Sequence, residues 1–225
     1  MNQRSLSWEG CVNTRDLGGL RTIDNHITRS GAIIRSDTPA RLTEAGWSAL
    51  HAYGIRTIVS LYTLGIEEEG LTVTPPFPDI AAVRVAIEDF TDKVFVQQWV
   101  DTSLWGTPLY YRDALERWPQ RHAAAISAIA RACPGGVLFH CGRGYDRTGI
   151  ISLLLLSLIG VVPEDIVVDY VLSVDPIREK LLAHEHSSVP EALLGAVAGL
   201  DVANYLRSGG TTQEDLDAIR WQLLG

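Results

Sequence analysis

The sequence predicts an α/β fold in which a mainly parallel central sheet is flanked by helices. Short β-branched and apolar segments alternate along the chain with longer segments of helical character, and this alternation is typical of strands joined by helical crossovers. The chain has 225 residues, of which 46% are hydrophobic and 20% charged. This composition is that of a single globular domain, which we expect to span residues 1–225.

The first half of the chain contains three predicted strands, at residues 32–35, 55–61 and 81–87. The segment 13–20 ends in two glycines and is expected to be a turn after a short entry strand. Thr43 is a suitable N-cap for a helix over residues 44–53, which Gly54 would end. The acidic segment 67–70 and the proline-rich segment 75–78 are expected to be exposed connections.

The second half is predicted to be mostly helical. An alanine-rich helix over residues 122–132 precedes a strand at 136–139, and an apolar helix follows over 150–162. Pro163 is a favourable first residue for a helix over 163–173. The C-terminal region 186–225 should contain an amphipathic helix over 190–207 and a last helix, for which Thr211 and Glu214 have the spacing of a capping box.

Aromatic residues are concentrated between Asp89 and Trp118. They allow two interpretations of the segment 88–121. One is a set of helices packed by their aromatic side chains. The other is a helical lid insertion whose aromatic faces line the entrance to a pocket and stack on an aromatic substrate.

Charge and apolar content exclude several classes of protein. The net charge of −8 and the absence of a basic run argue against a general nucleic-acid binder. The longest apolar run, residues 150–162, is shorter than the roughly 20 residues of a membrane-spanning helix. The polar N-terminus has no apolar signal core, and three cysteines without a pairing pattern favour a reducing cytoplasm. Export without a signal stays open.

The segment 140–149, His-Cys-Gly-Arg-Gly-Tyr-Asp-Arg-Thr-Gly, lies between a predicted strand and a predicted helix. A glycine-containing loop that leads into a helix N-terminus presents backbone N–H groups to an anion, and the helix dipole adds to the attraction. A thiol such as Cys141 should ionise readily in this environment. Arg147 can donate two hydrogen bonds to a phosphoryl group. The segment therefore predicts a site that hydrolyses phosphate esters.

The pattern His-Cys-x-x-Gly-x-x-Arg-Thr-Gly resembles the signature of the cysteine-dependent protein tyrosine phosphatase superfamily. Further motifs at residues 13–19, 35–37, 169–170 and 205–206 resemble the bacterial and fungal branch that includes secreted mycobacterial and Listeria phosphatases. The resemblance covers residues 13–224. It implies a phosphomonoester hydrolase, most readily a protein tyrosine phosphatase, that forms a cysteinyl-phosphate intermediate and needs no cofactor or metal.

Two positions depart from this family. Tyr145 stands where the family usually has lysine, and Ser60-Leu61-Tyr62 replaces its usual Asp-Leu-Arg. Loss of the lysine weakens the case for multiply phosphorylated substrates, although Arg143 lies in the same loop and can supply part of the missing charge.

Each loop residue can be given a role. Cys141 is the expected nucleophile, and Arg147 would neutralise charge as the leaving bond stretches. The substrate-binding residues would be Gly142, Arg143, Gly144, Tyr145 and Thr148, with the Thr148 hydroxyl donating to the thiolate. By resemblance Asp146 is the general acid. Asp89 and Asp92 are alternatives, and Asp146 could instead brace the loop through the backbone or Arg15.

Other functions stay open from the sequence alone. A phosphoinositide or small-molecule phosphatase, an arsenate reductase, a sulfur transferase or a non-catalytic phosphotyrosine-binding module could use a similar loop. The segment His184-Glu185-His186 suggests a metal site, but solvated side chains on a surface helix explain it better. The expected partner is a phosphorylated protein or a small phosphoester. The oligomeric state and the roles of residues 13–16 and 35–37 cannot be read from the sequence.

Overall fold

The computed structural model describes residues 4–67, 71–173 and 176–225, and it has the predicted α/β architecture. Its sheet contains five strands in the order β1-β2-β5-β3-β4. The strands are β1 (Arg15–Asp16), β2 (Ile33–Ser36), β3 (Ile55–Leu64), β4 (Ala81–Asp89) and β5 (Gly136–His140). β1 pairs antiparallel with β2, and all other pairs are parallel. The mainly parallel sheet is therefore confirmed.

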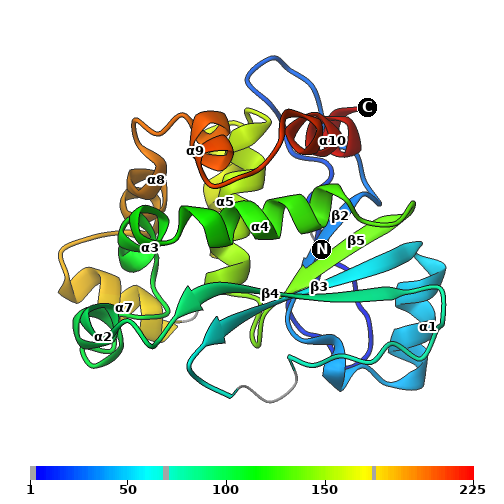
Figure 1. Cartoon of the computed structure of the whole chain (residues 1–225), viewed down its shortest axis with the longest axis horizontal. Helices are drawn as coiled ribbons and strands as arrows, with labels where there is room; N and C mark the ends of the chain where they lie inside the picture. Colours follow the sequence, from blue (N-terminus) through cyan, green and yellow to red (C-terminus); the bar gives the residue numbers. More distant parts are fainter. Residues whose placement is uncertain (1–3, 68–70, 174–175) are drawn as a thin grey trace.

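Helices cover both faces of this sheet (Figure 1). The larger group lies on one face and consists of α3 (Tyr111–Arg117), α4 (Pro119–Ala130), α5 (Asp146–Leu158), α6 (Pro163–Val171), α8 (Val189–Val197), α9 (Val202–Ser208) and α10 (Gln213–Leu224). On the other face, α1 (Glu44–Ala52) packs with the N-terminal segment. The carboxyl ends of β2, β5 and β3 therefore meet at one edge between the two helical layers, where α5 begins.

α5 is the central helix of the larger layer. Eleven of its thirteen residues are buried, and its apolar side chains are distributed around the whole helix, as expected for a helix surrounded by protein. Its first turn contains Asp146, Arg147 and Thr148, which are buried as well. The apolar body of α5 thus fixes these three polar residues at the edge of the sheet.

Several predicted boundaries need correction. The region 190–207 is not one helix, because the chain turns between α8 and α9 and Gly199 has a φ of +70°, a backbone conformation that favours glycine. The last helix is capped one residue later than predicted, by Thr212 with Asp215. β3 continues to Leu64, beyond the predicted end at residue 61. The predicted Thr43 cap is confirmed. Residues 68–70 of the acidic connection lie outside the described part of the chain.

The aromatic segment is built from short helices. It contains α2 (Lys93–Phe95), a π-helical turn (Val96–Val100), a 3-10 turn (Pro108–Tyr110) and α3. Five of its aromatic side chains belong to the hydrophobic core: Phe90, Phe95, Tyr110, Tyr111 and Trp118. This is the arrangement that the packed-helix interpretation expects. Movement of the segment as a lid stays a prediction.

Among the described residues, every helix is too short or too polar to span a lipid bilayer.

Candidate active site

The loop 141–145 connects the carboxyl end of β5 to the N-terminus of α5. β5 is the central strand of the sheet, with β2 on one side and β3 on the other, and His140 pairs with Ser36 and Ser60. The next residue, Cys141, is buried, with 3% of its surface exposed. The sheet and the buried helix α5 therefore hold the thiol, the loop and the first turn of α5 in one place.

The carbonyl groups of the loop are bonded to the body of the protein. Gly142 O accepts from Thr38 N at 3.1 Å. Arg143 O and Gly144 O accept from Asn13 Nδ2 at 3.0 and 3.1 Å, and Gly144 O also accepts from an Arg35 guanidinium nitrogen at 3.0 Å. The outer side of the loop is thus fixed by donors from the N-terminal segment and β2.

The backbone N–H groups of residues 142–146 donate to no other group in the part of the chain that the structure describes. Because the carbonyls are held on the outer side, these N–H groups are available to an anion on the inner side. Gly144 makes the tight turn possible: its φ is +70°, and a Cβ there would lie 2.5 Å from Ser36 O. The predicted anion cradle is therefore present in the backbone.

A buried charge network supports the donors that hold the loop. Asp169 of α6 is 1% exposed and pairs with Arg35 at 2.7 Å, Arg4 at 2.8 Å and Arg15 at 3.0 Å. Burial works against the Asp169 carboxylate, but the three guanidiniums outweigh it and hold its pKa well below the usual range. Arg15 in turn donates to Asn13 Oδ1 at 2.6 Å. The network thereby orients the Asn13 amide toward the loop.

The N-terminal motifs have two separate structural roles. Asp37 accepts from the backbone N–H of Asn13 at 3.0 Å and of Val12 at 3.1 Å, which ties residues 12–13 to the end of β2. Asp16 accepts from Gly18 N and Gly31 N. Arg15 and Asp16 therefore have different partners, and each connects the N-terminal segment to the body of the protein.

Among the groups that hold Arg147 are a backbone carbonyl of β3 and a carboxylate of β4. One of its guanidinium nitrogens donates to Leu61 O at 3.1 Å, and its Nε lies 3.9 Å from Glu88 Oε2. Glu88 is fully buried at the end of β4, accepts from Thr63 and Tyr110 hydroxyls, and has its pKa raised by burial. The sequence did not indicate Glu88, because it follows a predicted apolar strand and carries no motif.

His140 is a neutral orienting group. Burial lowers its pKa to about 4, so the ring is uncharged near neutral pH. Its Nδ1 lies 3.1 Å from Cys141 O, which can only accept, so Nδ1 carries the proton. Its Nε2 then accepts from Ser60 Oγ at 2.7 Å. A neutral ring that bonds to Cys141 O on one side and to Ser60 on the other is suited to orient the loop.

Asp146 is bonded to a residue that the sequence did not single out. Its Oδ2 accepts from Arg178 of α7 (Pro176–His184) at 2.7 Å, and both side chains are buried. Its Oδ1 is buried without a hydrogen-bond partner. The Arg178 guanidinium also lies 4.6 Å from the centre of the Tyr145 ring, and that of Arg143 lies 5.4 Å from it. The expected alternative of a bond to Arg15 is not the one formed.

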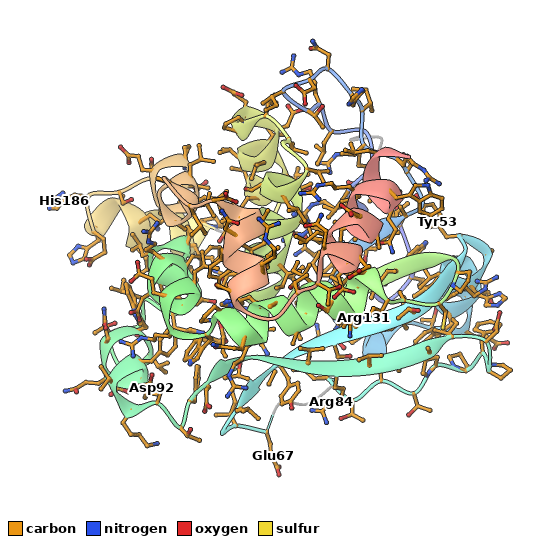
Figure 2. All side chains as sticks on the ribbon, turned by 45° about the horizontal axis from the view of Figure 1, so that its top comes forward. Tyr53, Glu67, Arg84, Asp92, Arg131 and His186 are labelled. Carbon is orange, nitrogen blue, oxygen red and sulfur yellow. The ribbon has the colours of Figure 1, made fainter. Side chains whose placement is uncertain are left out.

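The carboxylates of the two other candidate acids, Asp89 and Asp92, already bind groups of nearby helices and loops. Asp92 caps α2 at the periphery of the molecule (Figure 2) and pairs with Arg117 at 2.9 Å. Asp89 accepts from Thr91 and pairs with Arg121 at 2.8 Å. Their pKa values are lowered, chiefly by hydrogen bonds from Thr91 to Asp89 and from the Phe95 backbone to Asp92. Both are therefore held as carboxylates by structural partners.

Two further expectations concern Thr148 and the histidine-rich segment. The Thr148 hydroxyl is buried without a hydrogen-bond partner, so its expected bond to the thiol is not formed in this structure. His184 ends α7, and His186 lies at an exposed edge of the molecule (Figure 2). No group of three or more His, Cys, Asp or Glu side chains within residues 4–67, 71–173 and 176–225 is placed to hold a metal ion.

Comparison with known proteins gives a consistent result. Residues 6–225 match the model described as tyrosine phosphatase family. A putative tyrosine-protein phosphatase of Cupriavidus necator is 28% identical over 204 residues, which cover 89% of this chain and 71% of the relative. A tyrosine-protein phosphatase of Nostoc commune is 26% identical, with 85% and 74% covered. A triple specificity protein phosphatase of Mycobacterium tuberculosis is 27% identical, with 96% and 98% covered.

Proposed function

Because this chain belongs to the tyrosine phosphatase family, whose members are cysteine-dependent enzymes, we propose that Cys141 is the nucleophile of a protein tyrosine phosphatase. The observation that carries the proposal is the arrangement of the loop 141–147. Its carbonyls are bonded on the outer side, and its N–H groups are available on the inner side, at the N-terminus of α5. A phosphoryl group in this cradle lies directly beside the thiol and Arg147.

In the first step the Cys141 thiolate attacks phosphorus in line with the leaving oxygen. The S–P bond forms while the P–O bond to the leaving group breaks. The loop N–H groups hold the equatorial oxygens, and Arg147 neutralises the charge on them. Leu61 O and Glu88 fix the Arg147 side chain beforehand, so little reorganisation is needed when the substrate binds.

Asp146 is the proposed general acid of this step. It transfers its proton to the leaving alkoxide or phenoxide, a contribution that is typically worth about 10²–10⁴-fold in rate. In the second step a water attacks the phosphocysteine, the S–P bond breaks, and Asp146 takes the proton of the water. Its unpaired Oδ1 and its place in the loop favour it over Asp89 and Asp92, which already have structural partners.

The proposed substrate class is phosphotyrosine in proteins. The names of the Cupriavidus and Nostoc relatives support it, and the half-buried Tyr145 ring beside the cradle offers an aromatic surface for a phosphotyrosine ring. Comparison of kcat/KM for matched phosphotyrosine and phosphoserine peptides and for a phosphoinositide tests this assignment. A preference for either of the latter two would contradict it.

Replacement Cys141→Ser tests the nucleophile. We expect it to abolish turnover of 4-nitrophenyl phosphate while inorganic phosphate still binds, because the loop N–H groups and Arg147 remain. The wild-type enzyme, quenched in acid during turnover, should contain a phosphorylated cysteine that the variant lacks. Turnover by Cys141→Ser at the wild-type rate would disprove the role of the thiol.

A further inference from the structure

Arg178 lies outside the loop and donates to the side chain of the proposed acid. Its Nη2 donates to Asp146 Oδ2 at 2.7 Å, and the two side chains are 6% and 9% exposed. Burial lowers the pKa of Arg178, but the Asp146 charge and its hydrogen bond outweigh this and raise it above the usual value. A charged, buried and hydrogen-bonded pair of this kind has a defined geometry.

Two neighbours fix the position of the Arg178 side chain. Its guanidinium lies 4.6 Å from the centre of the Tyr145 ring, within cation–π distance. On another side, the turn at Gly106 approaches so closely that a Cβ would lie 3.1 Å from Arg178 Nη2 and 3.7 Å from Asp146 Oδ2. Arg178 is thus held where it meets the carboxylate.

The two oxygens of Asp146 differ in their surroundings. Oδ2 accepts the bond from Arg178, whereas Oδ1 is buried and has no hydrogen-bond partner within the described part of the chain. An unpaired buried carboxylate oxygen is costly, and such an atom in an active site indicates a partner that arrives with the substrate. We propose that Arg178 positions the general acid: it binds Asp146 by Oδ2 and leaves Oδ1 to deliver the proton to the leaving oxygen.

This inference rests on the proposed function, in which Asp146 is the acid. Two tyrosines also lie near Asp146, but they do not take the role of Arg178 as a charged partner of its carboxylate. Tyr111 of α3 donates to the Asp146 backbone carbonyl at 3.0 Å and bonds to Tyr170 of α6, and burial raises the pKa of both tyrosines, which stay neutral.

Arg178 also interacts with the charge that Asp146 gains in the first step. After proton transfer its guanidinium, 2.7 Å from Oδ2, stabilises the carboxylate that must act as base in the second step.

Arg178→Met and Arg178→Lys test the inference with two substrates, phenyl phosphate and 4-nitrophenyl phosphate. General-acid help matters more for phenol, the poorer leaving group. We expect kcat of Arg178→Met to fall about ten-fold or more with phenyl phosphate, a part of the usual 10²–10⁴-fold contribution, and much less with 4-nitrophenyl phosphate. The lysine variant keeps a charged donor and should retain more of kcat with phenyl phosphate.

The control is Arg220→Met, which removes a surface arginine paired with Asp217 on α10 and should behave as wild type. The double variant Arg178→Met/Asp146→Asn should be no slower than Asp146→Asn alone if Arg178 acts through Asp146. Equal losses with both substrates, or additive losses in the double variant, would overturn the inference even if Asp146 is the acid. If Asp146→Asn itself shows no dependence on the leaving group, the acid assignment fails first.

Discussion

Asn13 provides a direct test of why the loop N–H groups are available to an anion. In Asn13→Asp the side chain keeps its shape and the acceptor oxygen that Arg15 uses, but loses the amide that donates to Arg143 O and Gly144 O at 3.0 and 3.1 Å. Each lost hydrogen bond is worth about 0.5–1.5 kcal/mol, so the two amount to about 1–3 kcal/mol. Repulsion between the new oxygen and the two carbonyls adds to this loss.

If the whole of this free energy is lost from anion binding by the loop, affinity for a phosphate analogue falls by roughly 5- to 150-fold. The inhibition constant of vanadate measures this directly, and kcat/KM for 4-nitrophenyl phosphate should fall in parallel. Asn204→Asp on the surface helix α9 is a matched control, since its amide bonds only locally to Asp201, and it should bind vanadate as wild type. A folded Asn13→Asp enzyme with unchanged vanadate affinity would refute the orientation argument.

Three further predictions concern the buried charges. Asp169→Asn should reduce the free energy of unfolding at pH 7 by about 3–5 kcal/mol, because it removes the carboxylate charge that faces three buried guanidiniums. The Asp169 pKa is lowered in the folded state, so urea titrations should show the difference from wild type shrinking as pH falls below about 4. Glu88→Gln should lower kcat by about ten-fold or more, because Arg147 loses the carboxylate near its Nε. The loss should be smaller than the 10²–10³-fold cost of losing a transition-state donor, because Arg147 keeps its bond to Leu61 O. Finally, burial lowers the pKa of His140 to about 4 in the folded protein. Between about pH 6.5 and pH 4 the unfolded chain therefore binds one proton more at this residue, so the free energy of unfolding of the wild type should fall over this range. His140→Asn removes this contribution and should make the decline less steep.

The architecture could be predicted because its signals are local. The strands that became β2, β3, β4 and β5 are short apolar segments, and turn or cap residues separate them from helices. The loop 140–149 could be predicted for the same reason, since its nucleophile, glycines and arginine are contiguous. The prediction of one helix over residues 190–207 was wrong, because the amphipathic pattern continues across Gly199 although the backbone turns there and α8 ends.

The supporting residues of the site could not be predicted, because they meet only in the folded chain. Arg178 is 32 residues from Asp146 in sequence, and it lies in a polar helix in which nothing distinguishes an inward-facing arginine from a solvated one. Glu88 is even more remote from Arg147 and ends a strand without any motif. The role of Asn13 depends on a contact across 130 residues. Each of these side chains is identified by burial and partners, which a single sequence does not contain.

The proposed nucleophile and the proposed acid lie on one loop, which has a consequence for the rest of the domain. Cys141 and Asp146 are separated by a backbone segment whose carbonyls are bonded at three consecutive residues, so their relative position does not depend on closure of a separate acid-bearing loop. The segment 88–121 can then form part of the hydrophobic core, to which its buried aromatic side chains belong. Substitutions there should change stability first. Substitution of Arg178 in α7 should instead change the leaving-group dependence of catalysis, because Arg178 bonds to the proposed acid.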